Sequence, residues 1–478
     1  MNKKEDKKQV KKLGRSFPSM ESRHSDVLNV ATDIVKKLHK AGFEAYLVGG
    51  CVRDMIMKRV PIDYDIATNA KVEDIMKLFK KVVPVGVKFG VVLVIKEGIE
   101  FEVATFRSDG EYFDGRHPRT VHFSSAQEDA QRRDFTVNGL FYDPIKKKII
   151  DYVGGRDDIK KKVIRAIGDP QKRFSEDKLR ILRAIRFSTK LGFNIDKKTF
   201  DAIRNFVPAI TEVSYERIRD EFVYMMRGPL PLRALELMDE VGLLEKLLPE
   251  VTAMKNVEQN PKFHPEGDVF VHTMLMMKEL KNPSLVLAFS ALFHDIGKPK
   301  TFDPETLKTT YHSDVGARIT EKILKRFRFS NDDIEKVSWC VRNHMNFMHV
   351  KKMRIGKLKR MMTLDTFQDE LELHRIDCLA SHGMLDNYEF LLQKQEEFKK
   401  EDLKPKPLIN GHDLISLGFK PGPLFTEVLD EARDLQLEHK LNSRKEAIEW
   451  VMKQYGKDGI NISKRGVKKG KNKKRKRE

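Results

Sequence analysis

Cysteine is scarce in this sequence, which has three cysteines in 478 residues, and no two of them form a CxxC pair. The chain therefore lacks the thiols for a disulfide scaffold or a zinc knuckle, and this usage fits a reducing cytoplasm. Long apolar runs are missing as well. No uninterrupted apolar stretch has the length of a membrane span, and the basic N-terminal segment lacks the apolar core of a signal peptide. We expect neither export nor a membrane partner.

Acidic residues are outnumbered, with 71 Asp and Glu against 91 Lys and Arg, so the net charge is +20. This excess favours a polyanionic partner, because lysine and arginine neutralise phosphates and release counterions. Much of it lies near the two ends, since Met1–Lys12 and Lys464–Glu478 hold four and nine of the excess charges. We expect disordered basic arms over residues 1–24 and 456–478, which either touch RNA or only solvate the chain.

The remaining sequence changes character several times, and no internal repeat of fixed period is visible. After a helical pattern from Ser25, residues 25–165 carry short Val- and Ile-rich runs such as AYLVGG, KFGVVLVIK and IEFEVATF, which predict a mixed α/β unit. Amphipathic helical patterns follow over residues 166–255. Loops rich in proline then separate a histidine-rich helical block, residues 256–400, from a small helical unit, residues 401–455. We therefore expect a multidomain α+β protein.

The first candidate site is a pair of carboxylates in the run IDYDIAT. Asp63 and Asp65 are two residues apart, and in a strand such side chains point to the same face. Two aspartates suit Mg²⁺, which completes its octahedron with water and nucleotide phosphates. Glu102, in IEFEVATFR, is a candidate third carboxylate from another strand.

A phosphate-binding turn precedes this pair in the run LVGGCVRD. Gly49 and Gly50 follow an apolar strand and let backbone N–H groups approach phosphate, while the guanidinium of Arg53 can bridge phosphate oxygens as a fork. A metal pair and a phosphate grip in one short unit indicate nucleotide chemistry.

These two runs are followed by FEVATFR, RRDFTVNGL, DYVGGRDDI, FSEDKLRILRAIRFSTKLGF and YERIRDEF. In this order, over residues 45 to 225, the series resembles the class II CCA-adding enzymes and bacterial poly(A) polymerases of the polymerase-β-like nucleotidyltransferase superfamily. The resemblance implies a nucleotidyltransferase head with a small mixed sheet, followed by a helical neck. It also implies that Asp63 and Asp65 hold the metals of a two-metal phosphoryl transfer.

The resemblance implies further roles in nucleotide binding. Arg132 and Arg133 would contact the triphosphate, Asn138 would contact the ribose, and Asp134 would organise their motif. Asp177 and Arg180 are three apart and expected on one face of a helix, where an acceptor and a donor together can pair with the polar edge of a base. The resemblance also implies that Arg183 and Arg186 lie near the nucleotide or the RNA backbone.

The segment FRSDGEYFDGRHPRTVHF resembles the mobile loop that CCA-adding enzymes need when they switch from CTP to ATP. This favours complete addition of CCA to tRNA 3′ ends from CTP and ATP, with release of pyrophosphate. Enzymes that add only CC or only A, and poly(A) polymerases, share nearly all the same motifs and remain alternatives.

The histidine-rich block holds a second candidate site of imidazoles and carboxylates, in numbers that suit one or two transition metals. Its run FHDIGKP resembles the HD-type metal phosphohydrolases. The expected ligands are His272, His294, Asp295 and Asp377, with His312 and His344 as contributors to a second metal or a substrate phosphate. The metal would be a divalent transition ion such as Mn, Ni or Co. Phosphatase and phosphodiesterase activities on small phosphates or cyclic nucleotides are implied, and an inactive retained module is the alternative.

The last unit, with the run GHDLISLGFKPGPLFTEVL, resembles the C-terminal segment of CCA-adding enzymes that carry an HD-type domain, which implies binding of the tRNA body. Two other readings stay open. The protein could act mainly as an HD-type phosphohydrolase with an RNA-binding head, or as a basic RNA-binding protein whose two sites are inert.

Overall fold

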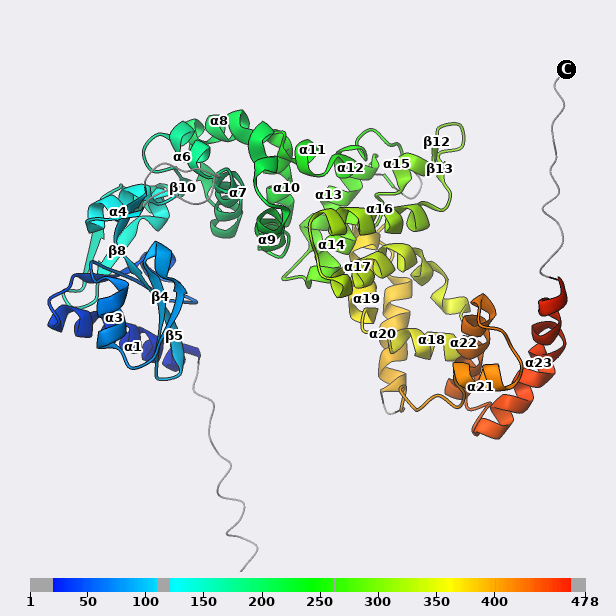
Figure 1. The fold of residues 1–478 in the computed structure, drawn as a ribbon. Helices are drawn as coiled ribbons and strands as arrows, with labels where there is room; N and C mark the ends of the chain where they lie inside the picture. Colours follow the sequence, from blue (N-terminus) through cyan, green and yellow to red (C-terminus); the bar gives the residue numbers. More distant parts are fainter. Residues whose placement is uncertain (1–19, 110–120, 262–263, 266, 400, 466–478) are drawn as a thin grey trace, which may run out of the picture. The chain divides into compact units, whose positions relative to one another are not determined.

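The computed structural model describes residues 20–109, 121–261, 264–265, 267–399 and 401–465, and it divides into two compact units, Met1–Pro249 and Glu250–Glu478. The first unit contains a mixed sheet followed by helices, and the second is built almost entirely of helices (Figure 1). The predicted fold class is confirmed. None of the described helices combines the length and the apolarity that a bilayer crossing requires.

The head is built on a seven-stranded sheet with the order β3-β4-β5-β2-β1-β8-β9. Its strands are β1 (Ala45–Val48), β2 (Asp65–Thr68), β3 (Val82–Gly86), β4 (Val91–Lys96), β5 (Ile99–Thr105), β8 (Leu140–Asp143) and β9 (Lys148–Asp151). β2 and β5 are parallel, and the other neighbouring strands are antiparallel. A separate pair, β6 (Arg107–Asp109) and β7 (Val121–Phe123), flanks the predicted mobile loop, whose residues 110–120 lie outside the described part of the chain.

Helices cover the sheet with apolar stripes. In α1 (Met20–Lys40) the buried residues Val30, Ile34 and Leu38 recur every four positions, so they form one stripe that packs on β1 and β2. α3 (Val72–Leu78) lies beside α1 (Figure 1). The other head helices are α2 (Gly50–Ile56), α4 (Ala126–Arg132) and α5 (Gly155–Lys161).

The helices after the head belong to the same compact unit. They are α6 (Pro170–Glu176), α7 (Leu179–Leu191), α8 (Lys197–Phe206), α9 (Tyr215–Met226), α10 (Pro231–Glu240) and α11 (Leu243–Leu247). The short parallel pair β10 (Val163–Ile164) and β11 (Asn194–Ile195) joins the end of the head to this part, and α7 packs against α9 and α10. The face of α7 that carries the predicted nucleotide-binding arginines is thereby held next to α9.

The second unit is organised around α14 (Leu285–Phe293), in which every residue from Val286 to Phe293 is buried. A helix that is apolar all round belongs in a core, and α14 packs against α13 (Val269–Glu279), α17 (Asn331–Asn343) and α19 (Phe367–Ala380) (Figure 1). The remaining elements before residue 400 are α12 (Pro249–Thr252), α15 (Lys298–Thr301), β12 (Phe302–Asp303), β13 (Lys308–Thr309), α16 (His312–Arg326), the 3₁₀ segment η4 (His344–Lys352), α18 (Ile355–Met362) and α20 (Asp386–Phe398).

The last helices, α21 (Gly411–Ser416), α22 (Pro423–Leu437) and α23 (Arg444–Arg465), share a small core of their own, with Leu414, Val428 and Val451 fully buried. α18 packs on α22 and is linked to it by ion pairs, for example between Arg360 and Asp434 at 2.7 Å. These contacts tie the C-terminal helices to the rest of the second unit.

Two local predictions from the sequence are wrong in their limits. Asp63 lies before β2 and not on it, because β1 ends at Val48, Gly49 turns away with φ of +77°, and no strand partner remains for residues before Asp65. The basic arms are shorter than predicted where they are described. α1 begins at Met20, in a stretch without glycine or proline, and α23 reaches Arg465 because a helix anchored in a core extends cooperatively.

Candidate active sites

Three carboxylates meet at one end of the parallel β2–β5 pair. Ile66 is in register with Val103, which places Asp65 and Glu102 next to each other, and Asp63 lies just before β2. Burial raises the pKa of Asp65 to about 7, and the charges of Glu102 and Asp63 act in the same direction against Arg133. Because these oxygens repel one another when ionised, the set fits a divalent cation, which would remove the repulsion.

The glycines of the turn, Gly49 and Gly50, lie against arginine side chains. The N–H of Gly49 donates to the carbonyl of Leu140 at 3.0 Å, so this one N–H of the turn is not available to a phosphate. A Cβ at Gly49 would lie 3.2 Å from Nη1 of Arg133, and one at Gly50 would lie 3.5 Å from Nη2 of Arg53. The missing side chains therefore leave room for two guanidinium groups.

Arg53 is 3% exposed, and its donors already have partners. Nε and Nη2 bind the two carboxylate oxygens of Asp54 at 2.9 and 3.1 Å, and Nη1 donates to Oδ1 of Asn138 at 2.6 Å. The predicted open fork is thus closed on Asp54. A phosphate would reach Arg53 only by exchanging with these partners.

The arginine pair at the end of α4 is positioned by an aspartate that was not predicted from the sequence. Asp129 is 1% exposed, and its two oxygens lie 2.7 Å from Nη2 of Arg132 and 3.0 Å from Nη2 of Arg133. Burial opposes the charge, but Arg133 and Arg132 hold the pKa of Asp129 below its usual value. The signal was present in the sequence, because Asp129 precedes the arginines by three and four residues within one helix.

Asp134 connects the head to α7. Its carboxylate accepts hydrogen bonds from Nδ2 of Asn138 at 3.3 Å and from Nε of Arg183 at 2.8 Å. Although burial opposes it, Arg183 lowers the pKa of Asp134, so the carboxylate is charged at neutral pH. The buried Glu221 of α9, also missed from the sequence, lies 3.0 Å from Nε of Arg186. Arg183 and Arg186 of α7 are therefore each held by an acid that is at most about 10% exposed.

The ring of Phe187 gathers three guanidinium groups. Arg53, Arg183 and Arg186 lie 5.6, 5.2 and 4.6 Å from its centroid. Lys190, one turn further along α7, is exposed and makes no ion pair or hydrogen bond with the described residues. Burial and the charge of Arg53 lower the pKa of Lys190, while Asp63 is among the charges that act against this shift. Sequence reasoning missed Lys190, whose neighbours come from distant segments.

The prediction that Asp177 and Arg180 share a helix is wrong. Asp177 has an extended backbone between α6 and α7, because its Oδ1 accepts the N–H of Leu179 and caps the start of α7. Arg180 lies in the first turn of α7 and binds Oε2 of Glu176 at 2.7 Å. The two predicted base-reading side chains therefore have separate partners.

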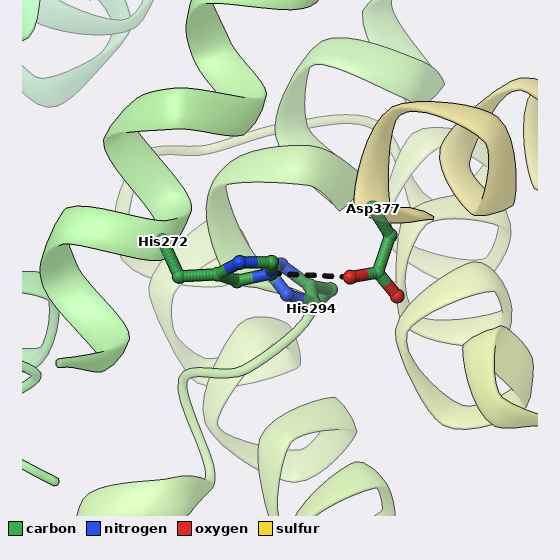
Figure 2. A group of neighbouring side chains, drawn as sticks. All are labelled: His272, His294 and Asp377. Carbon is green, nitrogen blue, oxygen red and sulfur yellow. Dashed lines mark ion pairs between the residues drawn. The ribbon is translucent and has the colours of Figure 1, made fainter. Parts of the chain in front are cut away.

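The six histidine and aspartate residues of the second unit converge as two groups whose ligand atoms lie within 4.8 Å of one another. The first group is His272, His294 and Asp377, with Nε2 of His272 3.1 Å from Oδ1 of Asp377 (Figure 2). The second is Asp295, His312 and His344, with 3.3 Å between the two Nε2 atoms. They come from α13, the end of α14, the first residues of α16 and η4, and α19.

The hydrogen bonds of the imidazoles prepare them for metal binding. Nδ1 of His294, His312 and His344 lies 3.0, 2.8 and 2.7 Å from a backbone carbonyl three residues earlier, so Nδ1 carries the proton and Nε2 offers a lone pair. Burial and His294 lower the pKa of His344 to about 4, which keeps the ring neutral. Buried imidazoles that present Nε2, together with two carboxylates, fit divalent transition metals.

A cavity of about 740 Å³ opens over this cluster. Lys298 lies at its base, with Nζ 2.6 Å from both Oδ2 of Asp295 and Oε1 of Gln259. Three partly exposed methionines, Met345, Met348 and Met384, line it together with polar residues. The cavity therefore combines a metal cluster with an apolar wall.

Gly297 allows the close packing of this site. A Cβ at this position would lie 2.0 Å from the carbonyl oxygen of His312 and 2.6 Å from the N of Gly316. The turn after Asp295 can therefore touch the start of α16 only without a side chain, which explains the glycine of FHDIGKP.

Family models match three successive regions of the chain. The Poly A polymerase head domain matches residues 45–165, the probable RNA and SrmB-binding site of polymerase A matches residues 192–255, and the HD domain matches residues 268–373. The CCA-adding enzyme of Anoxybacillus flavithermus is 31% identical over 430 residues, which cover 88% of this chain and 96% of that protein. The chain belongs to the CCA-adding enzyme family.

Other members of the CCA-adding enzyme family agree with this assignment. The CCA-adding enzyme of a Geobacillus species is 45% identical over 214 residues, which are 45% of this chain and 53% of that protein. The crystal structure of the Bacillus stearothermophilus CCA-adding enzyme in complex with CTP has a TM-score of 0.69 and 26% identity, covering 91% of this chain and 99% of that one. Nucleotidyltransferase heads and HD domains use divalent metal ions. In this member of the CCA-adding enzyme family, the carboxylate cluster of the head and the His–Asp cluster of the second unit suit such ions.

Proposed function

We propose that this protein adds CCA to the 3′ end of tRNA from CTP and ATP and releases pyrophosphate. The observation that carries the proposal is the cluster of Asp63, Asp65 and Glu102, in which partial burial of Asp65, followed by the charges of Glu102 and Asp63, raises the pKa of Asp65 to about 7. Such a cluster is unfavourable without a cation and therefore indicates a metal-dependent reaction. Membership of the CCA-adding enzyme family supports tRNA, CTP and ATP as the partners.

In this proposal the three carboxylates hold Mg²⁺, which when bound activates the RNA 3′-hydroxyl and stabilises the leaving pyrophosphate. Arg132 and Arg133, oriented by Asp129, contact the triphosphate in this proposal. Asn138 contacts the ribose in this proposal. Its side chain is already fixed, because it accepts a hydrogen bond from Arg53 and donates one to Asp134.

Nucleotide choice rests with Asp177 and Arg180 in this proposal. The carboxylate accepts from an amino group on the base and the guanidinium donates to a ring nitrogen or a carbonyl, so no nucleic-acid template is needed. The number of nucleotides added is assigned to the loop between β6 and β7. Partial CC- or A-addition and poly(A) synthesis remain alternatives to complete CCA addition.

Labelled CTP or ATP with Mg²⁺ and a tRNA that lacks its 3′ end tests the reaction. Asp65→Asn should abolish incorporation, and unchanged incorporation by this variant would contradict the proposal. Sequencing the 3′ ends made from tRNAs that lack three, two or one of the terminal nucleotides identifies the product, because the stopping point differs between CCA, CC, A and poly(A) addition.

A second activity is proposed for the His–Asp cluster, because six ligands, five of them buried and Asp377 partly exposed, form two groups of three. It would bind Mn, Ni or Co and hydrolyse phosphate esters, with phosphatase or phosphodiesterase activity. Residues 256–400 would carry this activity, while the helices of residues 166–255 would contact the RNA and those of residues 401–455 the tRNA body. His294→Ala should remove metal-dependent hydrolysis and leave nucleotide incorporation intact.

A cytoplasmic location is proposed for the protein. Cys51, Cys340 and Cys378 are all free and buried, as suits a reducing compartment.

A further inference from the structure

Asp177 and Arg180, the proposed base-reading residues, each form an ion pair with a different residue. Nη2 of Arg217, on α9, donates to Oδ2 of Asp177 at 2.8 Å, and the two side chains are 22% and 16% exposed. The other oxygen, Oδ1, accepts the backbone N–H of Leu179 at 3.0 Å. Arg180 is held separately, by Glu176 at 2.7 Å and by the carbonyl of Arg173 at 2.9 Å. Each half of the base-reading pair therefore has its own support.

These contacts determine how Asp177 can meet a base. A carboxylate with one oxygen on a backbone N–H and the other on a guanidinium cannot rotate freely. A charged carboxylate only accepts hydrogen bonds. Cytosine and adenine present an amino group where uracil and guanine present a carbonyl oxygen. An oriented Asp177 carboxylate therefore accepts from cytosine and adenine and repels the other two bases.

We propose that Arg217 is a positioning residue for nucleotide selection, which holds Asp177 as the oriented acceptor that admits CTP and ATP and rejects UTP and GTP. The inference rests on the proposed base-reading role of Asp177. It gives Arg217, in the run YERIRDEF, a part in the reaction without any contact to the nucleotide.

The neighbouring arginine of α9 shows that this contact is particular to Arg217. Arg219, whose side chain is 27% exposed, binds the adjacent residue, Asp220, at 2.8 Å. Arg217 instead reaches a residue that is 40 positions earlier in the chain. Arg219 thus offers a matched control on the same helix.

The test compares Arg217→Met, Arg217→Lys and Arg219→Met with the unmodified full-length protein, using single-nucleotide addition to a tRNA that lacks its 3′ end. We measure kcat and KM separately for CTP, ATP, UTP and GTP. For Arg217→Met, kcat/KM for CTP and ATP should fall about 10- to 100-fold, the range for one charged hydrogen bond, and should fall less for UTP and GTP. Arg217→Lys keeps a charged donor and should restore most of the discrimination. Arg219→Met should keep the discrimination between the four nucleotides that the unmodified protein has, whatever its effect on tRNA binding.

An equal loss for all four nucleotides would indicate a structural role and overturn the inference, as would unchanged discrimination. Thermal unfolding checks that each variant is folded, and Arg217→Gln replaces Arg217→Met if the latter is not. Asp177→Asn separates the two proposals. If it leaves discrimination intact, the base-reading role itself fails, whereas if it lowers discrimination and Arg217→Met does not, only the role of Arg217 fails.

Discussion

Gly297→Ala tests the close packing of the His–Asp site most directly. The added Cβ would lie 2.0 Å from the carbonyl oxygen of His312 and 2.6 Å from the N of Gly316. Both are backbone atoms, so no flexible side chain can move aside. The turn that carries Asp295 and the start of α16 that carries His312 must separate instead. The substitution should therefore weaken the fold and the second metal group together.

The expected size follows from the kind of clash. Overpacking in a well-packed interior costs about 1–3 kcal/mol, and backbone contacts this short belong at the upper end. For a unit of this size, about 3 kcal/mol corresponds to a fall of roughly 6–12 °C in melting temperature. Separation of Asp295 and His312 should also weaken Mn²⁺ binding by about 10-fold or more, since a misplaced ligand lowers metal affinity.

Scanning calorimetry of the full chain and titration with Mn²⁺ measure the two effects. Gly411→Ala is the control in the same unit, because a Cβ there would lie 3.8 Å from the nearest atom, on Phe425. It should change neither quantity. Nucleotide incorporation should persist in both variants, since the head belongs to the other compact unit. A melting temperature and Mn²⁺ affinity for Gly297→Ala equal to those of the control would refute the argument.

Three further predictions concern single side chains. Burial raises the pKa of Glu370 although Thr366 and Trp339 donate to its Oε1, so its charge destabilises the fold at neutral pH. This cost disappears as the pH falls below about 4.3, the pKa of glutamate in the unfolded chain. Glu370→Gln should therefore raise the melting temperature more at about pH 7.5 than at about pH 4. An equal rise at both pH values would contradict a destabilising charge on Glu370. Lys190→Gln removes the exposed amine near Arg53 and Asp63, which we expect to contact a phosphate of the nucleotide or of the tRNA. The KM for that substrate should rise about 3- to 10-fold in steady-state assays. Unchanged KM values for both substrates would exclude this contact. His344→Ala should lower the bound transition metal from two ions per chain to one, as measured by elemental analysis, because the group of His272, His294 and Asp377 is left complete; loss of both ions would show that the groups are not independent.

The sequence predicted the fold class and the domain order, since strand runs, amphipathic helices and proline-rich loops are local patterns. It also predicted the residue types at both sites. It failed where a contact depends on a distant segment. Asp129 was missed although its helix spacing to Arg132 and Arg133 was visible, and Arg217 and Lys190 were missed because their neighbours lie tens of residues away in the chain.

Local backbone geometry was only partly predictable. Asp63 and Asp65 have the spacing of a strand, yet only Asp65 is in one, because a strand needs a partner and β1 ends opposite it. Asp177 and Arg180 have the spacing of a helix, yet Asp177 caps the helix and is not part of it. Spacing along the chain therefore indicates which residues can act together, and the hydrogen-bond partners decide whether they share an element.

By itself the sequence determined the chemistry available to this protein: carboxylates for a metal, arginines for phosphates, and a set of histidines and aspartates for a second metal cluster. The tertiary structure alone decided how those groups are paired. It divided six ligands into two groups, closed Arg53 on Asp54, and set Arg217 on Asp177. The reason is physical, because side-chain identity is carried by the residue itself, whereas burial, pKa and pairing depend on which distant segments the packing of sheet and helices brings together.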